Sequence, residues 1–154
     1  MIIIREAVQA DFPLLFSLWR ENLALTGQIE NLRPEDTSPQ RWARQVSLWV
    51  QSPDHVVLGA FDGAQAIGFA MGEIRLSSPG MSADSLGMIT EFALDAHHYH
   101  GGAARKLAEA LRGWFADRGI TQLIVAVPRN AVTAQAFWRA YGSVAWMQLL
   151  WVNS

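Results

Sequence analysis

A strand, a small-residue loop, a helix and a second strand follow one another between about residue 87 and residue 127, and this succession constrains the fold most. The first strand is predicted over about 87–95, and the loop over 101–104 opens a helix that Gly119 ends. The apolar run 120–127 is typical of a strand inside a parallel pair. Such a unit predicts a right-handed crossover between parallel strands. The apolar face of the helix consists of Leu107, Leu111, Trp114 and Phe115.

The residues before this unit predict an antiparallel sheet with two helices. Residues 2–7 are rich in Ile and predict a short strand, after which Asp11 is expected to cap a helix. A polar loop over 26–37 leads to Ser38-Pro39, a cap followed by proline at the first helical position. Asp62-Gly63 predicts a hairpin turn between two apolar runs.

The last predicted elements are a helix that Gly142 ends and a strand over 144–152. Both faces of this strand are largely apolar, so it is either a central strand covered on both sides or the seam of a homodimer. The complete order is β-α-α-β-β-β-α-β-α-β. It predicts one α/β domain over residues 1–154, with a mixed central sheet and helices on both faces.

Composition excludes several classes of protein. The 154 residues include no cysteine, which excludes disulfides, thiolate metal sites and a cysteine nucleophile. A net charge of -2 without a run of basic residues gives no reason to expect a nucleic-acid partner. No apolar stretch approaches the roughly 20 residues that span a membrane, and no signal peptide is evident, so a cytoplasmic protein is expected. Seven Trp indicate an apolar surface that a partner buries.

The small-residue loop has the features of an anion site. Small side chains let backbone N–H groups converge, and the N-terminus of the following helix adds a positive dipole end. A pyrophosphate or phosphate suits such a site, although Gly101-Gly102 is equally compatible with a plain tight turn. The two glycine-rich nucleotide motifs, G-x-x-x-x-G-K-[ST] and G-x-G-x-x-G, are both absent.

The residues around this loop resemble a known family. The segment Thr90 to Arg105, TEFALDAHHYHGGAAR, resembles the acetyl-CoA-binding segment of the GCN5-related N-acetyltransferases (GNATs), a strand followed by R/Q-x-x-G-x-G/A and a helix. The segment Ala134 to Gly142 is similar to the family's A-x-x-x-Y-x-x-x-G. The opening Ile4-Arg5-Glu6-Ala7 through Asp11 is similar to its I-R-x-A-x-x-x-D.

The resemblance implies an N-acetyltransferase whose acetyl donor is acetyl-CoA and whose acceptor is a primary amine of a small molecule or a peptide. The amine would attack the thioester directly in a ternary complex. Glu91 would be the general base, and the backbone N–H groups of Ala93 and Leu94 would stabilise the oxyanion. Asn130 would bond the pantetheine arm. The remaining residues assigned to the cofactor are Phe92, His100, Gly101, Gly102, Ala103, Ala104, Arg105 and Phe137.

Three positions depart from the family pattern. Tyr99 replaces the Arg or Gln of the loop motif, and His100 occupies the next, usually small position. Trp138 occupies the place of the Tyr that protonates the departing thiolate in many members, and an indole N–H cannot do so. Two rivals therefore stay open: a catalytically silent acyl-CoA-binding sensor or partner subunit, and an assembly domain that binds no CoA.

Several candidate residues also have a structural interpretation. Glu91 is expected to share a strand face with Ile89 and Ala93, and an ion pair with an Arg or an exposed edge would explain it without catalysis. Tyr141 is expected to serve packing. The loop histidines His97, His98 and His100 are expected to face solvent, so no metal is predicted. Three carboxylates in the loop 26–37 would attract a cationic amine, although solubility explains them equally well; they are Glu30, Glu35 and Asp36.

Overall fold

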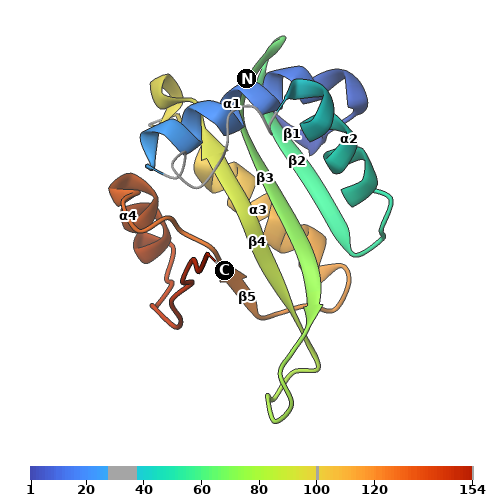
Figure 1. Ribbon diagram of the computed structural model, residues 1–154, viewed down its shortest axis with the longest axis vertical. Helices are drawn as coiled ribbons and strands as arrows, with labels where there is room; N and C mark the ends of the chain where they lie inside the picture. The colour runs from blue at the N-terminus through green and yellow to red at the C-terminus, as the bar shows by residue number, and fades with distance from the viewer. Residues whose placement is uncertain (28–37, 100, 154) are drawn as a thin grey trace.

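A computed structural model describes residues 1–27, 38–99 and 101–153 and shows a five-stranded sheet in the order β1-β2-β3-β4-β5 (Figure 1). The first four strands pair antiparallel, and β5 pairs parallel with β4. The mixed sheet and the parallel crossover predicted from the sequence are therefore confirmed. The strands are β1 (Ile2–Glu6), β2 (His55–Asp62), β3 (Gln65–Leu76), β4 (Ser85–Leu94) and β5 (Leu123–Val125).

Helices cover both faces of the sheet, as expected (Figure 1). One face carries α1 (Phe12–Leu25) and α2 (Pro39–Trp49), and the other carries α3 (Ala103–Ala116) and α4 (Val132–Ala140). The α1/α2 face buries one core cluster, which includes Phe12, Leu15, Phe16, Val46 and Phe69. The α3/α4 face buries a second, which includes Ile89, Leu107, Leu111, Phe115 and Trp138.

Two of the predicted local signals act as expected and one does not. Ser38 caps α2, since its hydroxyl accepts a hydrogen bond from Arg41 N at 3.1 Å. Gly63, at φ 60°, turns the hairpin between β2 and β3. Asp11 precedes α1 but forms no side-chain cap there. Its carboxylate instead accepts hydrogen bonds from Arg5 at 2.7 and 2.9 Å and from Val8 N at 2.8 Å. Asp11 therefore fastens β1 to the turn before α1.

A β-bulge interrupts the alternation of β4. The pairing with β3 runs Gly72 to Ile89 and then Met71 to Glu91, so Thr90 is the extra residue. One extra residue moves the following side chains to the opposite face. Ile89 consequently belongs to the α3/α4 core, whereas Ala93 belongs to the α1/α2 core. The prediction that Ile89 shares a face with Glu91 and Ala93 is wrong for this reason.

The end of the chain also differs from the prediction. Within the described residues, nothing from Ser143 to Asn153 is helix or strand, so the strand expected over 144–152 is absent. Strand β5 covers only Leu123–Val125 of the predicted 120–127. Its residues are half-buried, and β4 is its one neighbouring strand among the described residues. The strand prediction failed because apolar composition indicates burial and does not by itself supply a hydrogen-bonded neighbour. Among the described residues, no helix is long and apolar enough to cross a membrane.

Candidate active site

Strands β4 and β5 pair over a short distance only. Their register joins Gly87, Met88 and Ile89 to the three residues of β5, and the last bond runs from Ala126 N to Ile89 O at 3.0 Å. Beyond it, β4 continues through residues 90–94 with β3 beside it and, in the described part of the chain, no strand on its other side. Main-chain groups on that side of β4 are thus available to an extended ligand, as at any sheet edge.

Glu91 lies in this open part of β4, on the face that α1 covers. Burial raises the pKa of its carboxyl from 4.5 to about 7, and a side-chain hydrogen bond from Trp19 opposes part of that rise. Trp19 comes from α1 and stacks obliquely on Phe16 and Trp42, with ring centroids 5.8 and 6.1 Å away. None of the ion pairs among the described residues includes Glu91. A carboxyl that titrates near neutral pH can accept a proton and release it again.

The loop after β4 ends in an open helix N-terminus. Gly102 caps α3 with φ 79°, and a β-carbon placed there would meet nothing within 4 Å. The first intrahelical bond runs from Lys106 N to Gly102 O at 3.1 Å, so the N–H groups of Ala103, Ala104 and Arg105 precede it. The side chains of Ala103 and Ala104 are buried, which holds this turn on the sheet. The arrangement can bind an anion through backbone N–H groups and the helix dipole.

The other residues of this loop are placed as follows. Gly101 is exposed, and the side chain of Arg105 is exposed and pairs with Glu109 at 3.0 Å. His100 lies outside the described residues, as do Glu30, Glu35 and Asp36 of the predicted acceptor loop.

The two other loop histidines have a local partner in Asp95. Its carboxylate accepts a hydrogen bond from His97 N at 2.9 Å, and His98 Nδ1 lies 3.4 Å from it. Within the described parts of the chain, no group of three or more His, Asp or Glu side chains could hold a metal ion.

Aromatic side chains from α4 pack against the open part of β4. Phe92 stacks on Phe137 at 5.7 Å and meets the edge of Trp138 at 5.0 Å, and Phe137 stacks in turn on Tyr141 at 5.7 Å. Trp138 is 6% exposed, so it is a core residue. Leu94 lies half-buried on the same face, whereas Ala93 is buried on the other. The cluster fixes α4 beside β4.

Asn130 lies apart from this cluster. It is exposed in the turn before α4, and its amide nitrogen lies 3.6 Å from the position of a β-carbon at Gly27. The turn therefore approaches the end of α1.

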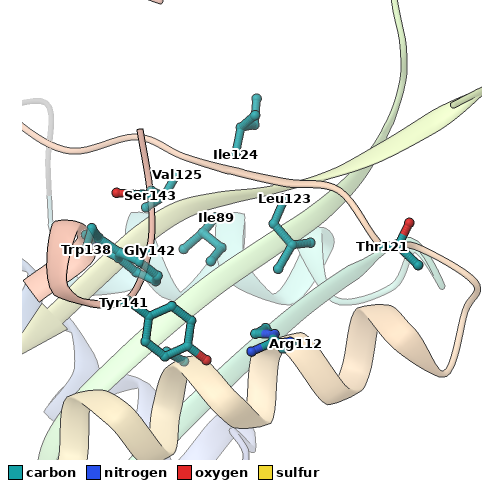
Figure 2. Close-up of a pocket in the computed structure, with 11 residues that line it drawn as sticks. Ile89, Arg112, Thr121, Leu123, Ile124, Val125, Trp138, Tyr141, Gly142 and Ser143 are labelled. Carbon is teal, nitrogen blue, oxygen red and sulfur yellow. The ribbon is translucent and has the colours of Figure 1, made fainter. Parts of the chain in front are cut away.

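A pocket of about 360 Å³ lies between α3, β5 and the end of α4 (Figure 2). Figure 2 shows Tyr141 and Arg112 on one side of it and Leu123 and Val125 on the strand. The Arg112 guanidinium lies over the Tyr141 ring, 5.8 Å from its centroid, and the neighbouring Tyr141 hydroxyl raises the pKa of Arg112. Sequence reasoning missed this pocket and the contact of Trp19 with Glu91. Both depend on how separate elements meet, and no local pattern carries that information.

Comparison with known proteins identifies the family. A family model described as "Acetyltransferase (GNAT) family" matches residues 17–142, which is most of the chain. The chain belongs to the GNAT acetyltransferase family. The resemblance noted in the sequence is thereby confirmed, and the enzyme class is N-acetyltransferase. No curated protein sequence matches this GNAT protein.

Solved structures agree in fold at low sequence identity. A predicted acetyltransferase from Clostridium acetobutylicum, solved with acetyl-CoA, has a TM-score of 0.80 and 19% identity, over 99% of this chain and 96% of that one. An aminoglycoside antibiotic 6'-N-acetyltransferase from Acinetobacter haemolyticus has a TM-score of 0.77 and 16% identity, over 99% and 97%. An aminoglycoside acetyltransferase from an uncultured soil metagenomic sample, solved with sisomicin, has a TM-score of 0.71 and 16% identity, over 99% and 95%. These similarities show that this GNAT chain has the acetyltransferase fold.

Proposed function

We propose that this protein transfers the acetyl group of acetyl-CoA to a primary amine of a small molecule or a peptide, by direct attack in a ternary complex. The observation that carries the proposal is Glu91, a carboxyl with a pKa of about 7 beside the open edge of β4. An amine is a nucleophile only after it loses its proton, and a base that titrates near neutral pH is suited to remove it. The solved relatives with acetyl-CoA and with an aminoglycoside support this choice of donor and acceptor.

The described residues could hold acetyl-CoA, the acetyl donor, at two places. The diphosphate of CoA would lie on the N–H groups at the start of α3, from Gly101 to Arg105, where Gly102 leaves open space. The pantetheine arm would extend along residues 92–94 as an added strand, because in the described parts of the chain only β3 pairs with the main chain there. We assign no separate role to His100, which the resemblance places at the same loop.

Chemistry at the thioester would use the face of β4 that α1 covers. Glu91, directly or through one water, would take a proton from the acceptor ammonium, and the free amine would then attack the carbonyl carbon. The backbone N–H of Leu94 would stabilise the oxyanion, because it points to the open side of β4. The N–H of Ala93 points to β3 instead, as does that of Asp95, which donates to Ile67 O at 2.8 Å. Collapse of the tetrahedral intermediate forms the amide and breaks the carbon–sulfur bond. The second amine proton then leaves to solvent or to the departing sulfur.

No side chain is assigned as general acid. Trp138 has no hydroxyl and packs into the aromatic cluster with Phe92 and Phe137. Tyr141 has a hydroxyl, but it lines the pocket between α3 and β5 and faces Arg112. Phe137 would support the cofactor site by packing on Phe92, and Asn130, in the turn before α4, would bond the pantetheine arm.

The first experiment is calorimetry with acetyl-CoA, followed by turnover with a panel of small primary amines, an aminoglycoside and a lysine-containing peptide. Binding with a dissociation constant near micromolar corresponds to about -8.2 kcal/mol and is readily measured. Glu91→Gln should keep that affinity and lose turnover by about 100-fold or more. A matched control is Glu73→Gln, a buried carboxyl on β3 that pairs with His55 and Arg75 away from β4's open edge.

The outcomes separate the proposal from its rivals. If Glu91→Gln keeps the wild-type kcat/KM at neutral pH, Glu91 is not the general base of the reaction. Firm binding of acetyl-CoA without turnover on any acceptor would favour the silent sensor that Trp138 suggests. No binding at millimolar acetyl-CoA would leave the assembly domain as the remaining explanation.

A further inference from the structure

The turn that leads from β4 into α3 contains Asp95, a residue that the proposed reaction does not use. Asp95 follows the last residue of β4 and precedes a short 3₁₀ helix, Ala96–His98. Its side chain is only 14% exposed, and a charged group held largely out of water is costly unless its surroundings supply hydrogen-bond partners. The partners of this carboxylate show which part of the turn it holds.

Both carboxylate oxygens of Asp95 have neighbours that carry donors. Oδ1 accepts a hydrogen bond from His97 N at 2.9 Å, which caps the 3₁₀ helix. Oδ2 accepts a hydrogen bond from Gln65 Nε2 on β3 at 3.3 Å and lies 3.4 Å from His98 Nδ1. The carboxylate thus joins the first residues of the turn to the strand beside it.

Main-chain hydrogen bonds continue from Asp95 to the start of α3. Asp95 N donates to Ile67 O at 2.8 Å, which fixes the beginning of the turn on β3. His98 N donates to Asp95 O at 2.9 Å, and Gly101 N donates to His98 O at 3.4 Å. Gly101 directly precedes Gly102, the N-cap of α3. The orientation of the N–H groups that follow Gly101 therefore depends on the conformation that Asp95 sets.

The side chains around this turn make the orientation of its N–H groups important. Tyr99 carries no positive charge, and the guanidinium of Arg105 pairs with Glu109 on its own helix at 3.0 Å. A diphosphate at this loop would therefore be held mainly by the backbone. Backbone N–H groups bind an anion well when they already converge, because ordering them at the moment of binding costs free energy.

We propose that Asp95 is a positioning residue for acetyl-CoA, because its carboxylate presets the turn so that the N–H groups at the start of α3 converge on the diphosphate. Asp95 acts through the turn and does not touch the donor. The inference rests on the proposed function, since it concerns the same diphosphate. Loss of the carboxylate should weaken acetyl-CoA binding. A direct effect of its charge would have the opposite sign, because removing a negative charge near a diphosphate favours binding.

The test measures acetyl-CoA affinity by calorimetry, steady-state kinetics, and amide exchange without ligand. Asp95→Ala should raise the dissociation constant and the KM for acetyl-CoA about tenfold, leave kcat unchanged and speed exchange of the His97 N–H. Asp95→Asn keeps an oxygen for His97 N and should restore the affinity to within about twofold of wild type. Gln65→Leu, an exposed change that folds even if Asp95→Ala does not, should raise the dissociation constant about twofold. Ser38→Ala is the matched control, because it removes a side-chain cap from α2 and should leave the affinity unchanged.

Three results would overturn the proposal. One is an acetyl-CoA affinity that Asp95→Ala and Gln65→Leu leave unchanged or increase, while wild type binds and turns over; the proposed function would then stand without this role. Another is a loss of affinity that Asp95→Asn shares in full, since the charge and not the cap would then be responsible. The third is a wild-type protein that binds no acetyl-CoA, which refutes the proposed function together with this role.

Discussion

Replacing Glu91 by Gln is expected to stabilise the protein at alkaline pH while it removes most of the activity. Burial holds the pKa of this carboxyl at about 7 in the folded protein, against 4.5 ordinarily. The folded state therefore binds the proton more tightly than the unfolded chain does. As pH rises from about 4.5 to about 7, the unfolded chain ionises first and the wild type loses stability. The difference between the two pKa values, at about 1.4 kcal/mol for each unit, corresponds to about 3 kcal/mol above pH 7.

Urea unfolding of wild type and Glu91→Gln at about pH 5 and about pH 8.5 measures this difference. Gln keeps the shape of the side chain and has no proton to lose, so its stability relative to wild type should grow by about 2–3 kcal/mol between the two conditions. Glu73→Gln is the matched control, because it removes a buried carboxyl on β3 that is paired with His55 and Arg75. If the difference in unfolding free energy between Glu91→Gln and wild type does not change with pH, the carboxyl of Glu91 does not have a raised pKa in the folded protein.

Four further substitutions test the geometry of the site and of the sheet beside it. Trp19→Phe removes the hydrogen bond that lowers the pKa of Glu91, so the rising limb of the rate against pH should move to higher pH, with activity recovered in alkaline buffer. Gly102→Ala places a residue with a side chain at a backbone φ of 79°, which L-residues rarely adopt. It should lower the free energy of unfolding by about 1–2 kcal/mol and weaken acetyl-CoA binding in calorimetry. Gly63→Ala, at φ 60° in the hairpin, should cost a similar stability and leave that binding unchanged. Gly87→Ala would place a β-carbon 2.7 Å from an aromatic ring of α3, and thermal unfolding should show a loss of about 1–3 kcal/mol.

The features that the sequence predicted correctly are those that one short stretch determines. Ser38 with Pro39 begins α2, and Asp62 with Gly63 turns the hairpin, because these residue types have strong local preferences at those positions. The parallel crossover from β4 through α3 to β5 also follows from the order of the elements alone. The position of Gly102 at the start of α3 was also predicted correctly from one short stretch of sequence.

The features that it missed depend on neighbours distant in the chain. Nothing in the sequence around Thr90 marks a bulge, since Thr is an ordinary strand residue, and the bulge is visible only in the register with β3. The ring of Trp19 reaches Glu91 only because α1 packs across that face of the sheet. The absence of a strand over 144–152 has a similar cause. Its composition favours a strand, but composition alone does not pair a segment with a sheet edge, and among the described residues this segment pairs with none.

The bulge at Thr90 is what makes the proposed site consistent. With uninterrupted alternation, Glu91 would share the α3/α4 face with Ile89, in the core that holds Phe115 and the ring of Trp138. The extra residue turns Glu91 to the α1 face and Phe92 to the aromatic rings of α4. The same residue lies where β4 ceases to pair with β5. One local irregularity thus separates the proposed base from the aromatic support of α4 and opens the edge of β4 between them.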